Sequence, residues 1–229
     1  MATNPNTGLK QAIICYVTDR KALSTIDPVE SLVETVRIAA AAGVDWVQLR
    51  EKDLPARELL RLTQNAIRAT SATRTCIILN DRLDIALAAG AGGVHLGAHS
   101  VPADEAVRWC RAGNAPAEFV IGVSCHSIEE AQNAERSGAN YIFFGPVFET
   151  PSKKIFGAPQ GTESLAEMCR SVRIPVIAIG GINETNGEQC RRAGAAGIAA
   201  IRLFQDCRDR ELLGEIVSRL HRGDRPHYS

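Results

Sequence analysis

The chain has 229 residues, of which 45% are hydrophobic and 23% charged, with 26 basic and 26 acidic side chains. This length and composition are typical of one globular domain over 1–229, with a core over about 12–222 and short polar tails, and they exclude a disordered chain. Because the net charge is zero, we expect neither nucleic acid nor a membrane as a partner. No apolar stretch is long enough to span a bilayer and no signal pattern is present, so we expect a cytoplasmic protein.

Short runs rich in β-branched residues alternate with amphipathic segments along the chain. Helical spacing of apolar residues is clear over 28–42 and 56–70. The runs that we interpret as strands are 12–17, 46–49, 75–79, 93–96, 119–123, 141–144, 175–179 and 197–201. Strands that alternate with helices pair in parallel through right-handed crossovers. We therefore predict an α/β protein with a single (β/α)8 fold, a TIM barrel.

An internal repeat supports this fold. A small-residue helix end, a glycine and a strand recur at Gly43, Gly90, Gly138 and Gly194, where each glycine is expected to end a helix in the left-handed conformation. The last interval is the longest, and its extra residues fall in the stretch 145–161, which we expect to be a mobile lid over the site. A doubly wound sheet is the alternative fold, but no Gly-x-Gly-x-x-Gly follows the first strand.

The seven cysteines are an odd number, are scattered and include no Cys-x-x-Cys pair. Several fall within apolar runs, which is typical of buried reduced thiols. We therefore expect neither a disulfide framework nor a zinc site.

In a barrel of this kind the active site lies at the carboxyl ends of the strands, so the residues that follow each strand are the candidates. After the second strand, alternation sends Gln48, Arg50 and Lys52 to one side. With Lys153 and Lys154 of the long loop, these donors suit an anion such as pyrophosphate. The alternative interpretation is an ordinary strand end with solvated charges.

Other strand ends carry residues with two interpretations each. Asp81 is either a ligand for Mg²⁺ or the N-cap of the next helix. Gly180 and Gly181 either let backbone N–H groups approach a phosphate, to which Arg202 would add a charge, or only make a tight turn. His126 is either an acid or base or a structural hydrogen-bonding residue.

Six blocks in order carry a resemblance to a known family. They are QLREK (48–52), NDR (80–82), GVHLG (93–97), GVSCHS (122–127), GPVFETPSKK (145–154) and AIGGI (178–182). The chain resembles the thiamine phosphate synthase and thiazole tautomerase family from about Tyr16 to Phe204. The resemblance implies a (β/α)8 barrel that joins an aminopyrimidine methyl pyrophosphate to a thiazole phosphate, releases pyrophosphate and uses Mg²⁺.

The resemblance also implies a set of site residues. The metal ligand would be Asp81, and the residues closest to the chemistry would be Lys153, Arg50, Ser124 and His126. The substrate-binding residues would be Gln48, Arg50, Lys52, Asn80, Ser124, Thr150, Ser152, Lys153, Gly180, Gly181, Ile201 and Arg202.

The sequence departs from the synthase pattern in two places. Ser100 stands where synthases usually carry a second metal-binding carboxylate, which Asp104 would replace only after a rearrangement, and Arg202 stands where they carry a serine. Thiazole tautomerases, which this family includes, also lack the full metal set and use a histidine that matches His126, but synthases carry that histidine too, so it does not discriminate. We therefore predict a synthase, since Arg50 and its neighbours are kept, with a tautomerase or a non-catalytic precursor-binding barrel as the alternatives. The sequence does not determine the oligomeric state, and a homo-oligomer is one of the options.

Overall fold

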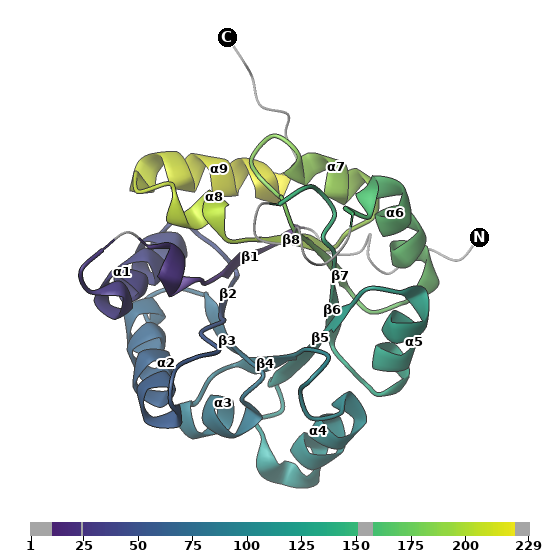
Figure 1. The fold of residues 1–229 in the computed structure, drawn as a ribbon, viewed down its shortest axis with the longest axis horizontal. Helices are drawn as coiled ribbons and strands as arrows, with labels where there is room; N and C mark the ends of the chain where they lie inside the picture. Colours follow the sequence, from purple (N-terminus) through teal and green to yellow (C-terminus); the bar gives the residue numbers. More distant parts are fainter. Residues whose placement is uncertain (1–10, 24, 151–157, 223–229) are drawn as a thin grey trace.

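The computed structural model describes residues 11–23, 25–150 and 158–222, which form a closed barrel of parallel strands in chain order (Figure 1). The barrel closes where β1 pairs with β8, with Ile13 opposite Gly197. The strands are β1 (Ile13–Val17), β2 (Trp46–Leu49), β3 (Cys76–Asn80), β4 (Gly93–Leu96), β5 (Val120–Cys125), β6 (Tyr141–Phe144), β7 (Val176–Ile179) and β8 (Gly197–Ala200). The predicted (β/α)8 barrel is confirmed, and the doubly wound sheet is excluded because that sheet stays open.

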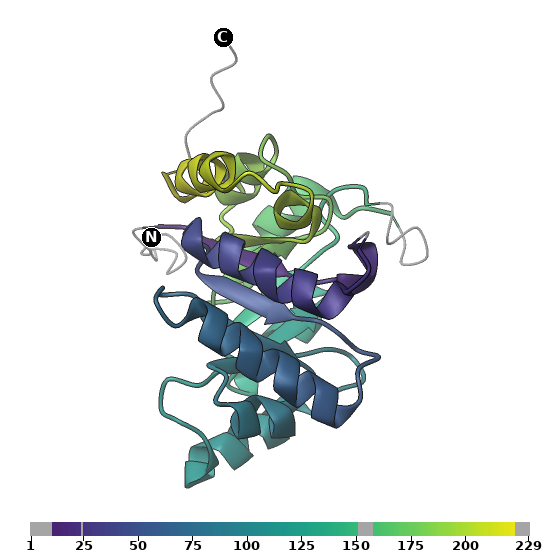
Figure 2. The same ribbon diagram turned by 90° about the vertical axis from the view of Figure 1, so that its left-hand side faces the viewer.

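The helices form a ring around this barrel, and Figure 2 shows them stacked along its side. They are η2 (Arg20–Ala22), α1 (Pro28–Ala41), α2 (Ala56–Thr70), α3 (Leu83–Ala89), α4 (Ala103–Trp109), η3 (Cys110–Asn114), α5 (Ile128–Arg136), α6 (Gly161–Ser171), α7 (Gly187–Arg192), α8 (Arg202–Gln205) and α9 (Arg210–Arg222). In the described part of the chain, none of them is both long and apolar enough to cross a membrane.

Local sequence explains where the helices begin and end. Asp27 caps α1, since its side chain accepts hydrogen bonds from the backbone N–H groups of Val29 and Glu30. The four repeat glycines have positive φ, from 76° at Gly90 to 99° at Gly194, which is the left-handed conformation expected of them.

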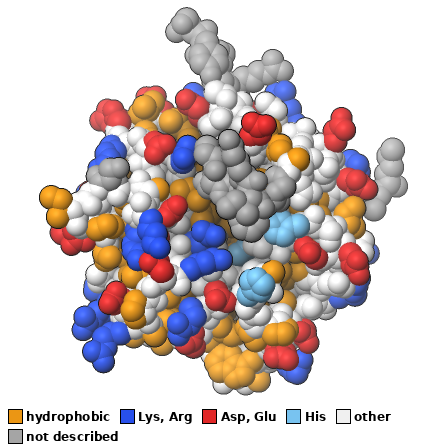
Figure 3. All heavy atoms as spheres, viewed as in Figure 1, with side chains coloured by type: hydrophobic (Ala, Val, Ile, Leu, Met, Phe, Trp, Pro, Cys, Tyr) orange, Lys and Arg blue, Asp and Glu red, His pale blue; other side chains and the backbone are white. Residues whose placement is uncertain are grey.

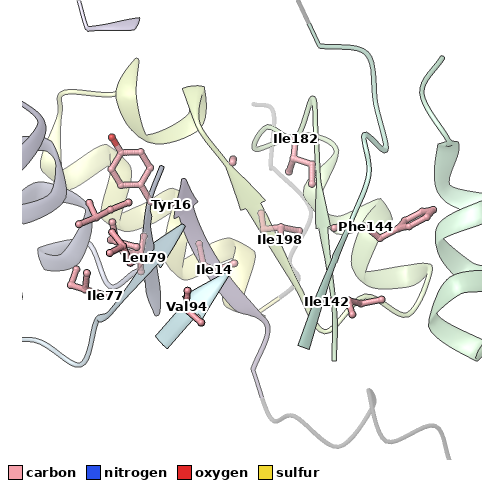
Figure 4. Packing of buried hydrophobic residues seen from close by; sticks show 14 of the residues in the cluster. Ile14, Tyr16, Ile77, Leu79, Val94, Ile142, Phe144, Ile182 and Ile198 are labelled. Atoms are coloured by element: carbon pink, nitrogen blue, oxygen red, sulfur yellow. The ribbon is translucent and has the colours of Figure 1, made fainter. Parts of the chain in front are cut away.

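The core has two layers that follow from strand alternation. In β1, Ile14 and Tyr16 belong to the layer between sheet and helices, together with the residues labelled in Figure 4, whereas Cys15 and Val17 belong to the layer inside the barrel. Alternate residues of one strand therefore serve different layers. This rule decides which polar residues of the strand ends face the barrel interior.

All seven cysteines are free thiols in the structure. Four of them are buried, and burial raises the pKa of the Cys125 and Cys190 thiols to about 12. Thiols of this kind stay protonated and unreactive near neutral pH.

Several strand ends differ from the prediction by one residue, and the largest difference is at the end of β5. β5 continues past Val123 to Cys125, because Ser124 and Cys125 pair with Phe143 and Phe144 of β6. Ser124 is therefore held by the sheet rather than by a loop, which fixes its position more tightly.

Candidate active site

Two amides meet inside the barrel near the carboxyl ends of β2 and β3. Nε2 of Gln48 donates a hydrogen bond of 3.1 Å to Oδ1 of Asn80. Gln48 is only 2% exposed, and its Oε1 has no hydrogen-bond partner among the described residues. Buried polar atoms nearly always have a partner, so an orphaned acceptor at this position is suited to a ligand.

Arg50 follows Gln48 by two residues and lies at the same side of the strand. The half-buried guanidinium bonds to no carboxylate among the described residues, and its charge contributes to the low pKa of the buried His95. Lys52, farther along, is exposed. The predicted alternation is confirmed at Gln48 and Arg50, since Leu49 packs in the layer outside the barrel. An unpaired guanidinium beside the barrel interior is suited to a bidentate grip on phosphate oxygens.

Glu51 lies on the side of the strand opposite Gln48 and Arg50, as alternation predicts, but the sequence interpretation gave it no role. It is 4% exposed on the outer side of the sheet, where Oε1 accepts 2.6 Å from the Thr18 hydroxyl and Oε2 accepts 2.9 Å from Arg20. The Thr18 hydroxyl oxygen in turn accepts a bond of 3.0 Å from the backbone N–H of Arg50. Glu51 therefore ties the loop after β1 to the backbone that carries Arg50. The available signal was alternation in QLREK, which sends the Glu51 side chain to the side of the strand opposite Gln48 and Arg50.

We expect Glu51→Ala to lower the free energy of unfolding by about 1–3 kcal/mol, because it leaves the Thr18 hydroxyl and the backbone N–H of Arg20 without their acceptor and removes one of the two carboxylates that pair with the Arg20 guanidinium. Urea denaturation measures this loss. Asp53→Ala is the matched control, since it removes another carboxylate from the same arginine but from a side chain that is 43% exposed. Equal losses in the two variants would show that the buried network has no special role.

His95 is the second residue to which the sequence interpretation gave no role. It is 2% exposed, with Nε2 placed 2.9 Å from the Ser124 hydroxyl and Nδ1 placed 3.2 Å from the Tyr141 hydroxyl. Burial, with a contribution from the nearby Arg50 charge, lowers the pKa of His95 to about 3. His95 is therefore a neutral imidazole at physiological pH. Alternation within β4 was the signal that placed it inside the barrel.

His126 lies at the rim rather than inside the barrel. Its Nδ1 is 2.8 Å from the carbonyl oxygen of Gly145, and its backbone N–H donates to Glu130. These bonds fit the structural interpretation of this residue. No described residue bonds to its Nε2, so that nitrogen is available to a ligand.

Gly180 and Gly181 make a tight turn against the loop that follows β6. Their φ angles are 98° and 67°, and a Cβ on Gly180 would lie 2.6 Å from Cα of Pro146. A Cβ on Gly181 would overlap the carbonyl oxygen of Glu149. Packing alone therefore requires glycine at both positions, whatever their role towards a phosphate.

The remaining predicted residues have mixed outcomes. Thr150 is half-buried at the end of the described stretch, Ile201 caps α8, and Arg202 begins that helix with an exposed side chain. Ser152 and Lys153 lie outside the described residues, as do Lys154 and the rest of the stretch 151–157 of the predicted lid. The interpretation of this loop therefore stays a prediction.

The candidate metal position holds one carboxylate. Asp81 has a φ of 69°, rare for a residue with a side chain, and it is not the helix N-cap, because Arg82 takes that place. The Ser100 hydroxyl accepts 2.8 Å from the backbone N–H of Gly97, and Asp104 pairs with Arg108. No cluster of three His, Cys, Asp or Glu residues is present in the described part of the chain. Asp81 fits Mg²⁺ only where substrate oxygens and water supply the other ligands.

The side chains at the barrel mouth, and not the size of a cavity, identify the candidate site. A cavity of about 910 Å³ lies outside the barrel against α1 and α8, away from the residues above. Looking down the barrel, Lys, Arg and His side chains gather around the middle of the face in Figure 3. The fold and this face define a class of protein: a (β/α)8 barrel whose mouth is suited to an anionic small molecule.

Comparisons with known proteins identify the family. Residues 14–204 match the family model described as thiamine monophosphate synthase. A thiamine-phosphate synthase of Roseiflexus castenholzii is 41% identical over 83% of this chain and 80% of its own, and one of Chlorobium phaeobacteroides is 35% identical over 92% and 96%. The structure of thiamine phosphate pyrophosphorylase from Pyrococcus furiosus superposes with a TM-score of 0.77 at 33% identity, over 90% of this chain and 94% of that one. The chain belongs to the thiamine monophosphate synthase family, as its sequence motifs predicted.

Proposed function

We propose that this barrel is a thiamine-phosphate synthase, which couples an aminopyrimidine methyl pyrophosphate with a thiazole phosphate. In this substitution the bond from the methylene carbon to the pyrophosphate oxygen breaks and pyrophosphate leaves with the electron pair. The ring nitrogen of the thiazole phosphate supplies the electron pair for the new bond to that carbon. The observation that carries the proposal is Arg50, which bonds to no carboxylate among the described residues and follows two residues after Gln48 of the Gln48–Asn80 amide pair. A tautomerase binds no pyrophosphate, so its reaction has less need of the positive charge of Arg50.

The chain's own residues divide the work between the two halves of the first substrate. The Oε1 of Gln48 is an acceptor for the amino group of the pyrimidine, in a pocket where it has no other partner. Arg50 and Lys52 stabilise the negative charge that grows on the leaving pyrophosphate. Ser124, held by the sheet, donates to the same anion. No protein nucleophile is needed, because charge stabilisation and orientation accelerate such a step.

Asp81 is the residue that would hold Mg²⁺ in this proposal, together with substrate oxygens and water. Bound there, the ion would supply further positive charge to the leaving pyrophosphate. The strained backbone of Asp81 supports this role, as does its carboxylate, which accepts no hydrogen bond from any described residue. We also propose a cytoplasmic location, since substrates that carry a phosphate or a pyrophosphate do not cross an apolar membrane unaided.

Thiazole tautomerase is the second candidate, favoured by the single carboxylate at the metal position and by the free Nε2 of His126. Two variants separate the candidates. For a synthase, Asp81→Asn abolishes most coupling at limiting Mg²⁺, while Ser100→Asp raises it by adding a second carboxylate. For a tautomerase, Asp81→Asn is silent, and His126→Ala costs about 10²- to 10⁴-fold. Each variant is measured for thiamine phosphate formation and for thiazole tautomerisation, and we expect the synthase pattern.

A further inference from the structure

Three side chains from neighbouring strands form a hydrogen-bonded chain inside the barrel. The Tyr141 hydroxyl, from the start of β6, lies 3.2 Å from Nδ1 of His95 on β4. The opposite ring nitrogen, Nε2, lies 2.9 Å from the hydroxyl of Ser124, near the end of β5. The chain therefore leads from the closed interior of the barrel towards its mouth.

Burial fixes the direction of each hydrogen bond. Tyr141 is 1% exposed, and its ring packs against Trp46 and Phe143 at centroid distances of 4.7 and 5.5 Å. Among the described residues, its hydroxyl has a hydrogen-bond partner only in His95. A buried hydroxyl proton without an acceptor is costly, so Tyr141 donates to Nδ1. A neutral imidazole that accepts at Nδ1 carries its proton at Nε2, and it donates that proton to Ser124. The Ser124 oxygen is then the acceptor, and its own proton is free.

We propose that the chain from Tyr141 through His95 turns the Ser124 hydroxyl proton outward, so that Ser124 donates to an oxygen of the bound pyrophosphate. His95 and Tyr141 are positioning residues, because they act on the anion only through Ser124. The other tautomer would draw the serine proton back to Nε2 and present oxygen lone pairs to the anion, which repels it. This inference rests on the proposed function for the identity of the anion.

The sequence makes room for this arrangement at one glycine. Gly122 of β5 lies opposite Tyr141 in the pairing register, and a Cβ there would overlap Cζ of Tyr141, the atom that carries the hydroxyl. His95 also stacks on Phe143, with ring centroids 4.2 Å apart. Both contacts restrict how the rings turn, so the bond directions above are held by packing as well as by hydrogen bonding.

The first test needs neither substrate nor activity. Nitrogen chemical shifts of ¹⁵N-histidine-labelled protein report which ring nitrogen of His95 is protonated. We expect a protonated Nε2 and an unprotonated Nδ1 in the unliganded wild-type protein. A protonated Nδ1 would overturn the proposal. Assignment uses His95→Gln, which removes the signal and keeps an amide donor near the position of Nε2.

The second test is a double-mutant cycle on the affinity for inorganic pyrophosphate, measured by calorimetry with Mg²⁺ present. Ser124→Ala should weaken binding about tenfold and Tyr141→Phe by a smaller factor, and the double variant should bind no more weakly than Ser124→Ala alone. His95→Gln should bind more tightly than His95→Leu. Additive losses in the cycle would overturn the proposal, as would a wild-type protein that does not bind pyrophosphate.

The matched control is Tyr16→Phe. Tyr16 is as buried as Tyr141, but its ring lies in the layer outside the barrel and its hydroxyl has no partner, so this change should leave the pyrophosphate affinity unaltered. Thermal unfolding of each variant confirms that it is folded. If the losses of pyrophosphate affinity are coupled but the protein forms no thiamine phosphate, the proposed function is refuted. The inference about the hydrogen-bonded chain is then still supported.

Discussion

Arg50→Ala is expected to weaken the binding of inorganic pyrophosphate by about one to two decades while the barrel stays folded. A charge-assisted bidentate contact in a shielded site contributes roughly 1.5–3 kcal/mol, which corresponds to that factor. The guanidinium bonds to no carboxylate among the described residues, so its loss breaks no internal ion pair. Calorimetry with Mg²⁺ present measures the dissociation constant.

Two further variants sharpen this test. Arg50→Lys keeps the charge but loses the planar fork, so its affinity should lie between those of the wild type and Arg50→Ala. Arg108→Ala removes the same charge from an exposed arginine that already pairs with Asp104, and it should leave the affinity unchanged. If Arg50→Ala bound pyrophosphate as tightly as the wild type, the cluster after β2 would be an ordinary solvated rim.

Gly122→Ala is expected to destabilise the barrel by about 1–3 kcal/mol or more, although alanine is the smallest side chain that can be added. The new methyl group would overlap the Tyr141 ring, which is packed on its other sides by Trp46, Phe143 and His95. Because no neighbour is a flexible side-chain end, the backbone of β5 or β6 must move. Urea denaturation measures the loss.

Gly214→Ala is the control for this prediction. Gly214 lies within α9, where an added Cβ meets nothing within 4 Å, so alanine should stabilise the protein by about 0.5–1 kcal/mol through helix propensity. A neutral Gly122→Ala variant would show that the interior of the barrel relaxes freely. In that case the bond directions proposed for His95 would lose their support from packing.

The sequence predicted the barrel and one half of the site for the same reason, namely strand periodicity. Alternation placed Gln48 and Arg50 on the interior side, and the repeat glycines marked the helix ends. What periodicity cannot show is which interior residues meet across the barrel. His95 and Tyr141 lie 46 residues apart in sequence and meet only because β4, β5 and β6 are neighbours with a particular register.

The two interpretations of Asp81 illustrate a local limit of the same kind. An aspartate between a strand and a helix is a common N-cap, and nothing in the residues NDRLD distinguishes the cap from its neighbours. In the structure the helix begins one residue later, and Asp81 takes the left-handed conformation. The backbone dihedral angles of so short a loop depend on how the end of β3 and the start of α3 are placed relative to each other. Sequence alone does not reveal this placement.

The most direct test of the proposed function is incubation of the full chain with both substrates and Mg²⁺, followed by measurement of thiamine phosphate and pyrophosphate. We expect the two products in equal amounts, with strongly reduced formation in Arg50→Ala. No coupling product at any Mg²⁺ concentration, together with a metal-independent tautomerase activity that His126→Ala abolishes, would contradict the account.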